Sequence, residues 1–169
     1  MATIQTSPVK PLVGILTGSP NDLGVVEKAQ ETLASLGIAS ELLVLSAHRT
    51  PERVTEYIQQ APLRGVEVFI ACAGMAAHLA GAVAAQTLLP VIGVPLASGS
   101  LNGFDALLAT VQMPPGIPVA TVGVDGAKNA GYLAARILAI KHPHITAKLQ
   151  ADLEVQRERY DSPDKPRVR

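Results

Sequence analysis

Cysteine is almost absent from this 169-residue chain, and aromatic residues are scarce. Cys72 is the one cysteine, so no disulfide can form within the chain and nothing argues for secretion. Phe, Tyr and Trp together make up only 3% of the residues. Because 48% of the residues are nevertheless hydrophobic, a sizeable core has to be built from aliphatic side chains and alanine.

An excess of charge of either sign is also absent. The 14 basic and 14 acidic residues cancel, so the sequence carries no electrostatic footprint of a nucleic-acid or membrane-binding protein. No apolar run approaches the roughly 18 residues of a membrane-spanning helix. The segment before Pro11 also lacks the apolar centre of a signal peptide. We therefore expect a soluble cytoplasmic protein with a single domain.

The common cofactor and metal motifs are missing as well. The patterns GxGxxG and GxxxxGK[ST] do not follow the first apolar run, which disfavours a NAD or ATP site of the usual kind. No spacing of Cys, His and acidic residues suits a metal ion. We expect Cys72 to be a small buried hydrophobe. His142 and His144 flank Pro143 without nearby acidic partners, and we expect both to be solvated.

What the sequence does contain is a regular alternation of short apolar runs and amphipathic segments. Strands are predicted at 12–17, 42–45, 66–71, 90–95 and 119–122. Helices are predicted at 23–36, at 51–60, after His78 through Gln86, at 103–112 and at 127–140. Such short alternation is typical of right-handed βαβ units around a parallel sheet.

The character of the sequence changes after Pro143. Ile145, Leu149 and Leu153 form an apolar stripe at four-residue spacing on an otherwise polar helix, which needs a partner surface to be stable. The chain's own domain or a neighbouring subunit can supply that surface. We divide the sequence into a flexible N-terminus (1–10), an α/β domain (11–141), a C-terminal oligomerisation helix (142–160) and a flexible tail (161–169).

The hexapeptide 46–51, SAHRTP, is the most informative stretch for function. It joins a predicted strand to a helix that Thr50 can cap and Pro51 can begin. His48 and Arg49 are therefore expected at the carboxyl end of a strand, the edge at which open parallel sheets bind ligands. An imidazole there can move protons near neutral pH, and a guanidinium can hold a phosphate or carboxylate by paired hydrogen bonds. A solvated turn is the alternative.

Two further turns follow predicted strands. In the first, Ser19, Asn21 and Asp22 stand where a helix begins and can bind an anion or a sugar hydroxyl, although Asn21 or Asp22 can equally serve as a helix cap. In the third, small residues follow Gly74 and allow a close backbone approach to a ligand. His78 is either a second polar contact or a helix-face residue. Met75 either lines a ligand or fills a gap in the core.

With these turns in view, the sequence resembles the class I N5-carboxyaminoimidazole ribonucleotide (N5-CAIR) mutases of purine biosynthesis over residues 12–140. The resemblance is carried by SAHRTP at 46–51, GSxxD at 18–22, AGxAAHL at 73–79 and VQMPxGxPVAT at 111–121. Asn129-Ala130 fits as well. Asn21 stands where the family often has Ser, Met75 replaces a second Gly, and Ala80 replaces a Pro. In the related class II enzymes, which carboxylate the free aminoimidazole ribonucleotide (AIR) directly, a Lys follows the histidine.

The resemblance implies a flavodoxin-like three-layer α/β sandwich with a parallel sheet, an octamer, and a C-terminal helix that extends to a neighbouring subunit. It also implies cofactor-free, metal-free transfer of a carboxylate through carbon dioxide, with His48 as the proton carrier. Direct AIR carboxylation and non-catalytic nucleotide-phosphate binding are the alternatives. The residues expected to contact the nucleotide substrate are Ser19, Asn21, Asp22, Ser46, Ala47, Arg49, Ala73, Gly74, Met75, Ala76, His78 and Leu79.

Overall fold

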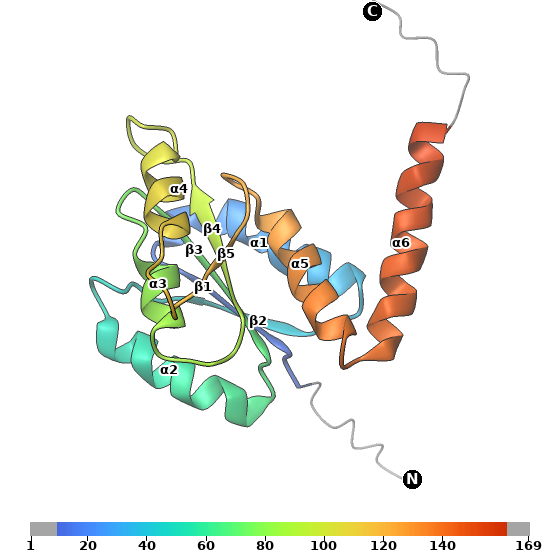
Figure 1. The fold of residues 1–169 in the computed structure, drawn as a ribbon, viewed down its shortest axis with the longest axis horizontal. Helices are drawn as coiled ribbons and strands as arrows, with labels where there is room; N and C mark the ends of the chain where they lie inside the picture. The colour runs from blue at the N-terminus through green and yellow to red at the C-terminus, as the bar shows by residue number, and fades with distance from the viewer. Residues whose placement is uncertain (1–9, 162–169) are drawn as a thin grey trace, which may run out of the picture.

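A five-stranded parallel sheet forms the centre of the molecule, with the strand order β2-β1-β3-β4-β5. We describe residues 10–161 from a computed structural model of the chain (Figure 1). The order matches that of flavodoxin-like folds, in which the direction of winding reverses between β1 and β3. The predicted α/β sandwich is therefore confirmed. The strands are β1 (Val13–Thr17), β2 (Ser40–Val44), β3 (Val68–Gly74), β4 (Val91–Leu96) and β5 (Ala120–Thr121).

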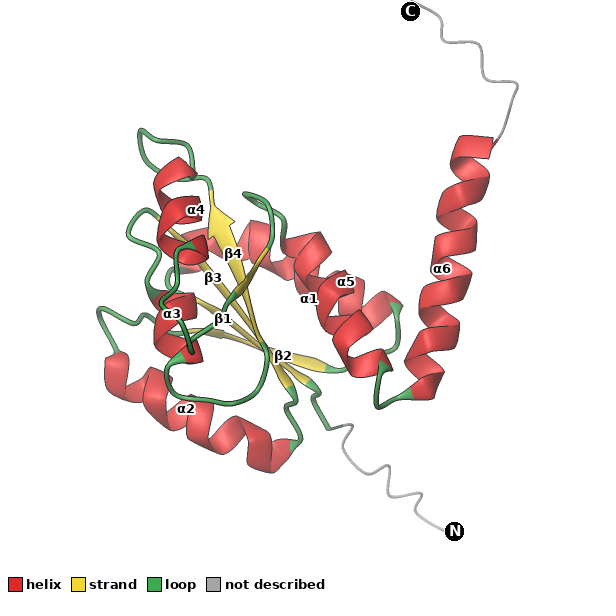
Figure 2. Ribbon diagram, in the orientation of Figure 1, coloured by secondary structure: helices red, strands yellow, loops and turns green. Residues whose placement is uncertain are grey.

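Helices cover both faces of this sheet and produce three layers (Figure 2). The helices α1 (Leu23–Ser35) and α5 (Ala127–Ala139) pack on one face, and α2 (Pro51–Arg64) and α3 (Leu79–Ala84) pack on the other. The helix α4 (Phe104–Val111) lies on the same side of the sheet as α3. Its Thr110 side chain lies against Gly93 in β4, on the face of that strand that is turned towards α3. None of the helices in this range combines the length and apolarity needed to cross a bilayer.

Alternate side chains of the central strands enter two separate cores, as strand geometry requires. In β3, Ile70 and Cys72 contribute to the core under α1 and α5, whereas Phe69 and Ala71 contribute to the core under α2 and α3. Both faces are buried, which explains why these strands are apolar throughout. Cys72 is fully buried, as predicted, and burial raises the pKa of its thiol.

Several element ends differ from the prediction. We expected α2 to end near Gln60, but it continues to Arg64. Pro62 lies in its last turn, and Gly65, with φ 118°, ends the helix in the left-handed conformation. β5 has only two residues, Ala120 and Thr121, and these are the residues that pair with β4. α3 is likewise short and ends at Ala84.

The apolar stripe after Pro143 is divided between two environments. It lies on α6 (Pro143–Asp161), which stands beyond α5 at the side of the molecule (Figure 1). Ile145 is fully buried in the core under α1 and α5, and Leu149 packs against that core. Leu153 is 39% exposed. The start of α6 is thus part of the chain's own core, while its later turns leave apolar surface uncovered.

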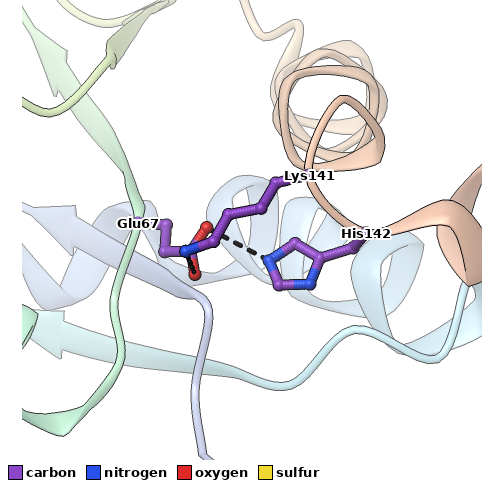
Figure 3. A network of polar contacts seen from close by, with 3 residues as sticks. All are labelled: Glu67, Lys141 and His142. Carbon is purple, nitrogen blue, oxygen red and sulfur yellow. Dashed lines mark hydrogen bonds and ion pairs between the residues drawn. The ribbon is translucent and has the colours of Figure 1, made fainter.

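A small ionic cluster fixes the junction between α5 and α6 (Figure 3). Lys141 Nζ donates to Glu67 Oε1 at 2.8 Å, and His142 Nε2 lies 3.1 Å from Glu67 Oε2. The expectation that His142 is solvated without an acidic partner was therefore wrong, because Glu67 is separated from it by 75 residues in sequence and approaches only in the fold. His144 is exposed, as predicted.

This cluster gives Glu67 a predictable effect on stability. Burial alone would raise the pKa of Glu67, but hydrogen bonds from Lys141 and His142, with their positive charges, outweigh it and lower the pKa. A lowered carboxyl pKa stabilises the folded state above the unfolded-state value of about 4.5, and that stabilisation is lost as the pH falls through the folded-state value.

We therefore expect Glu67→Gln to lower the free energy of unfolding at pH 7 by up to about 1 kcal/mol, the scale of partly exposed ion pairs. The difference from the original protein should shrink towards zero at roughly pH 3. Urea denaturation at both pH values measures it, because urea does not screen charges, with Glu154→Gln, at an exposed position on α6, as the control. An equal effect at both pH values would contradict this account of the cluster.

The predicted flexible segments 1–10 and 161–169 lie almost wholly outside the described residues, and the boundaries proposed at 11, 142 and 161 stay predictions.

Candidate functional site

The carboxyl ends of β1, β2 and β3 meet at one edge of the sheet. Thr17, the last residue of β1, is level with Val44 in β2 and with Cys72 in β3. The winding reverses between β1 and β3, so the turns that follow these strands diverge and leave a crevice, as in other doubly wound folds. A cavity of about 300 Å³ lies there. It is lined by Gly18, Ser19, Asn21, Asp22, Ser46, Ala47, His48, Arg49, Ala73, Gly74, Met75, Ala76, Leu79 and Ser98.

The turn after β2 is closed by its own polar side chains. The Ser46 N–H donates to Thr50 Oγ1 at 3.1 Å, and Thr50 Oγ1 donates in turn to the Ser46 carbonyl at 3.2 Å. The Arg49 N–H donates to Ser46 Oγ at 3.2 Å. Thr50 occupies the N-cap position of α2, but its hydroxyl bonds across the turn and does not cap the helix as we had expected. These bonds hold His48 and Arg49 at an exposed tip.

The His48 ring faces the ring of His78, which comes from the turn after β3. His48 Nε2 and His78 Nδ1 are 2.8 Å apart, and the two ring planes are nearly perpendicular, at 85°. One of these nitrogens donates and the other accepts, so the pair shares one proton across the contact. His78 precedes α3 without capping it by its side chain. It is therefore a polar contact of His48, while direct contact of His78 with the substrate stays a prediction.

Arg49 connects the second turn to the first. Its Nη2 donates to the Gly18 carbonyl at 2.8 Å, and its Nε donates to Ser46 Oγ at 3.4 Å. The guanidinium therefore stands beside the turn that carries Ser19 and Asp22. Burial raises the pKa of Asp22, with a smaller contribution from the charge of Asp125, whereas Thr17 and Arg49 oppose the shift.

The first turn is a short 3-10 helix, Pro20–Asp22, that leads into α1. Ser19 Oγ accepts from the Asn21 N–H at 3.2 Å and so acts as the cap of this turn. Asp22 makes no capping hydrogen bond with its side chain at the start of α1. Asp22 therefore occupies the N-cap position without capping the helix through its side chain, and the residue lines the cavity.

The turn after β3 brings backbone close to the cavity. A Cβ at Gly74 would overlap the Ser98 hydroxyl and lie 3.2 Å from the Leu96 carbonyl oxygen, so a side chain here would require Ser98 to move. Met75 has φ 53° and is 58% exposed at the cavity. The expectation that Met75 fills a core gap was wrong. A left-handed backbone favours glycine, which accounts for the second glycine that the family resemblance led us to expect here.

The cavity is lined by every residue that we proposed as catalytic or as a substrate contact, apart from His78, which contacts His48 from one side. Two cavity residues were missed. Gly18 belonged to a motif we had recognised but was not proposed as a contact. Ser98 lies in the loop after β4, and only its Ser- and Gly-rich composition signalled it. A larger groove of about 680 Å³, at the amino end of β4, is lined without any titratable side chain and so offers no proton carrier.

Comparison with known proteins agrees with this geometry. Residues 12–159 match the family described as AIR carboxylase. A Pyrococcus horikoshii protein named N5-carboxyaminoimidazole ribonucleotide mutase is 58% identical over 141 residues, which cover 83% of this chain and 80% of that protein. A Thermotoga maritima protein of the same name is 56% identical over 140 residues, covering 83% and 82% of the two chains.

The crystal structure of Treponema denticola PurE superposes with a TM-score of 0.84 at 32% identity and covers 92% of this chain and 99% of that one. A family match over most of the chain, relatives at more than half identity and a shared fold all agree. The chain belongs to the AIR carboxylase (PurE) family.

Proposed function

We propose that this protein is an N5-CAIR mutase of purine biosynthesis. The reaction moves a carboxylate from the exocyclic nitrogen of an aminoimidazole ribonucleotide to ring carbon C4. The observation that carries the proposal is the His48 imidazole at the cavity, paired with His78 at 2.8 Å and flanked by Arg49 and Asp22. The mutases that this chain is similar to support the same activity.

His48 acts first as an acid and then as a base. It protonates the exocyclic nitrogen as the carbamate C–N bond breaks and carbon dioxide leaves. C4 of the imidazole ring then attacks the carbon dioxide, and the neutral His48 removes the C4 proton, so its protonation state is restored. One group can serve both steps because imidazole titrates near neutral pH. His78 takes part by holding the His48 ring in place and sharing its proton.

The other cavity residues orient the nucleotide. Arg49 and Ser19 bind the phosphate, and the Asp22 carboxylate accepts hydrogen bonds from ribose hydroxyls. Fixing the base against His48 lowers the entropic part of the barrier without any further chemistry. Ala73, Gly74 and Ala76 give the cavity small, mostly apolar walls on the side nearest β3, where carbon dioxide can stay between the two steps.

A substrate assay tests the proposal directly. The purified protein is supplied with N5-CAIR, or with AIR with and without bicarbonate, and formation of 4-carboxy-AIR is followed. We expect turnover of N5-CAIR without bicarbonate. Turnover of AIR that depends on bicarbonate or carbon dioxide would instead identify the direct carboxylase, the activity after which the family is named. Tight nucleotide binding without turnover of either substrate would identify a binding module.

Arg49→Lys tests the phosphate contact. Lysine keeps the charge but cannot reproduce the paired donors of the guanidinium, so we expect KM for N5-CAIR to rise about tenfold with a small change in kcat. Steady-state kinetics measure both constants. Arg53→Lys, on the exposed face of α2, is the matched control and should leave both unchanged. An unaltered KM in the Arg49 variant would contradict phosphate binding by Arg49.

We also propose that the enzyme works as a cytoplasmic homo-octamer, as the family resemblance implies. Exposed apolar residues on α4 and α6 support an assembly, among them Phe104 at 61% and Val155 at 49% exposure. Light scattering at micromolar concentration tests the size of the particle. A monomer would contradict the octamer while leaving the chemistry at His48 open to its own tests.

A further inference from the structure

Asp125 lies outside the cavity but is tied to the loop that brings Ser98 into it. The side chain comes from the turn between β5 and α5, and Asp125 Oδ1 accepts from the Ala97 N–H at 2.9 Å. The Asp125 N–H donates to the Pro95 carbonyl at 2.9 Å. One residue therefore binds the chain on both sides of Leu96, where β4 ends and the loop 97–103 begins.

The pairing between β4 and β5 ends before the residues that Asp125 contacts. The paired register covers only Ile92 with Ala120 and Gly93 with Thr121, and one more bond runs from the Val122 N–H to the Gly93 carbonyl at 3.1 Å. Beyond that point the last residues of β4 have no strand beside them on this edge. Asp125 supplies hydrogen bonds to this edge in place of a strand: its N–H donates to the Pro95 carbonyl, and its side chain accepts from the Ala97 N–H.

Asp125 adopts an unusual backbone conformation to make these bonds, with φ 56°. Few residues other than glycine occupy this region, and Asp and Asn are the ones that tolerate it best. The neighbouring Val124 packs against the other end of the loop, because a Cβ placed on Gly103 would lie 2.6 Å from its Cγ1. The turn 122–126 thus contacts both ends of the loop 97–103.

The loop in turn forms one wall of the cavity. Ser98 follows Ala97 directly, lines the cavity, and stands so close to Gly74 that a Cβ on Gly74 would overlap its hydroxyl. The charge of Asp125 also lies near enough to raise the pKa of Asp22. Loss of the hydrogen bond from the Ala97 N–H would free Ser98 to move away from Gly74. The cavity would then open on the side where carbon dioxide is expected to stay between the two steps.

We propose that Asp125 is a positioning residue that holds Ser98 against Gly74 and thereby keeps carbon dioxide in the cavity between the two steps of the reaction. The inference rests on the proposed mutase function. It concerns the coupling of the steps: when carbon dioxide escapes after the C–N bond breaks, AIR is released in place of 4-carboxy-AIR. The balance between these two products therefore reports on Asp125.

Three variants separate the hydrogen bond from charge and from backbone strain. Asp125→Asn keeps an acceptor oxygen and tolerates the positive φ, so it should release AIR and 4-carboxy-AIR in nearly the original ratio. Asp125→Gly keeps the backbone conformation but loses the acceptor, and we expect the AIR fraction to rise about tenfold. Asp125→Ala loses both and should behave like Asp125→Gly with lower thermal stability.

Asn102→Gly is the matched control. Asn102 also has a positive φ, 48°, at the other end of the same loop, and its side chain makes no hydrogen bond within residues 10–161. The substitution adds the conformational freedom of glycine without breaking a side-chain hydrogen bond, so the product ratio should not change. A rise equal to that of Asp125→Gly would overturn the proposal, because general loop flexibility would then be the cause.

Hydrogen exchange gives a readout that does not depend on activity. Protection of the Ala97 amide, followed by mass spectrometry, should be lost in Asp125→Gly and kept in Asp125→Asn. The proposal is overturned if Asp125→Gly keeps both protection and coupling, or if Asp125→Asn uncouples as strongly as Asp125→Gly, since charge would then be the cause. If the original protein makes no 4-carboxy-AIR while the exchange results hold, the proposed function fails and the contact stands.

Discussion

Replacing His48 by asparagine is expected to lower kcat for N5-CAIR by about 10²–10⁴-fold, the usual contribution of a general acid–base. Asparagine is similar in shape to part of the imidazole ring and can still form a hydrogen bond with His78, which His48 contacts at 2.8 Å. It cannot take up and return a proton at neutral pH. Nucleotide affinity should therefore stay within a few-fold, because Arg49 and Ser19 are unchanged. Single-turnover kinetics and calorimetric titration with AIR measure the two effects separately.

His144→Asn is the matched control for this substitution. His144 is an exposed histidine far along the chain, on α6, and lies outside the cavity. The same chemical change there should leave kcat and affinity unaltered. An active His48→Asn enzyme would remove His48 from the proton transfer. A variant that no longer binds the nucleotide would make His48 a binding residue instead.

The fold was predictable because the three central strands, β1, β3 and β4, are buried on both sides. A strand that is buried on both faces has a continuous run of apolar residues, such as Val68–Ala71. Because these strands alternate with helices over short distances in the sequence, few arrangements of a parallel sheet are possible. The ends of elements were less predictable, because they depend on contacts made later. In β5, for example, only Ala120 and Thr121 pair with β4. The local sequence does not indicate how many residues of a strand will find a partner.

That the proposed residues line one cavity was predictable for a related reason. Parallel strands bring their carboxyl ends to one edge, so polar turns that follow different strands had to meet. What remained hidden were contacts between distant segments. His78 approaches His48, thirty residues away, at 2.8 Å, and the partner of His142 is Glu67. Ser98 lines the cavity from the loop 97–103, which Asp125 in the β5–α5 turn contacts through the Ala97 N–H.

Ile145→Ala is expected to lower the free energy of unfolding by about 2–5 kcal/mol, as for other large apolar side chains removed from a core. Ile145 is fully buried among residues of β1, β3, α1 and α5, although it belongs to a helix that follows the completed sheet. The loss should appear in denaturation curves at every protein concentration, because the contact lies within one chain. A neutral substitution would mean that α6 does not contribute to the core of its own domain.

Leu153→Ala is the counterpart on the same helix, two turns further on. Its side chain is 39% exposed in the single chain, so truncation should cost an isolated chain less than about 1 kcal/mol. If the later turns of α6 cover a neighbouring subunit, the variant should dissociate on dilution at concentrations where the original protein stays assembled, and its stability should become concentration-dependent. Light scattering across a dilution series decides this. An unchanged particle size would assign the subunit contact to other apolar surfaces, of which the exposed face of α4 around Phe104 is the next to test.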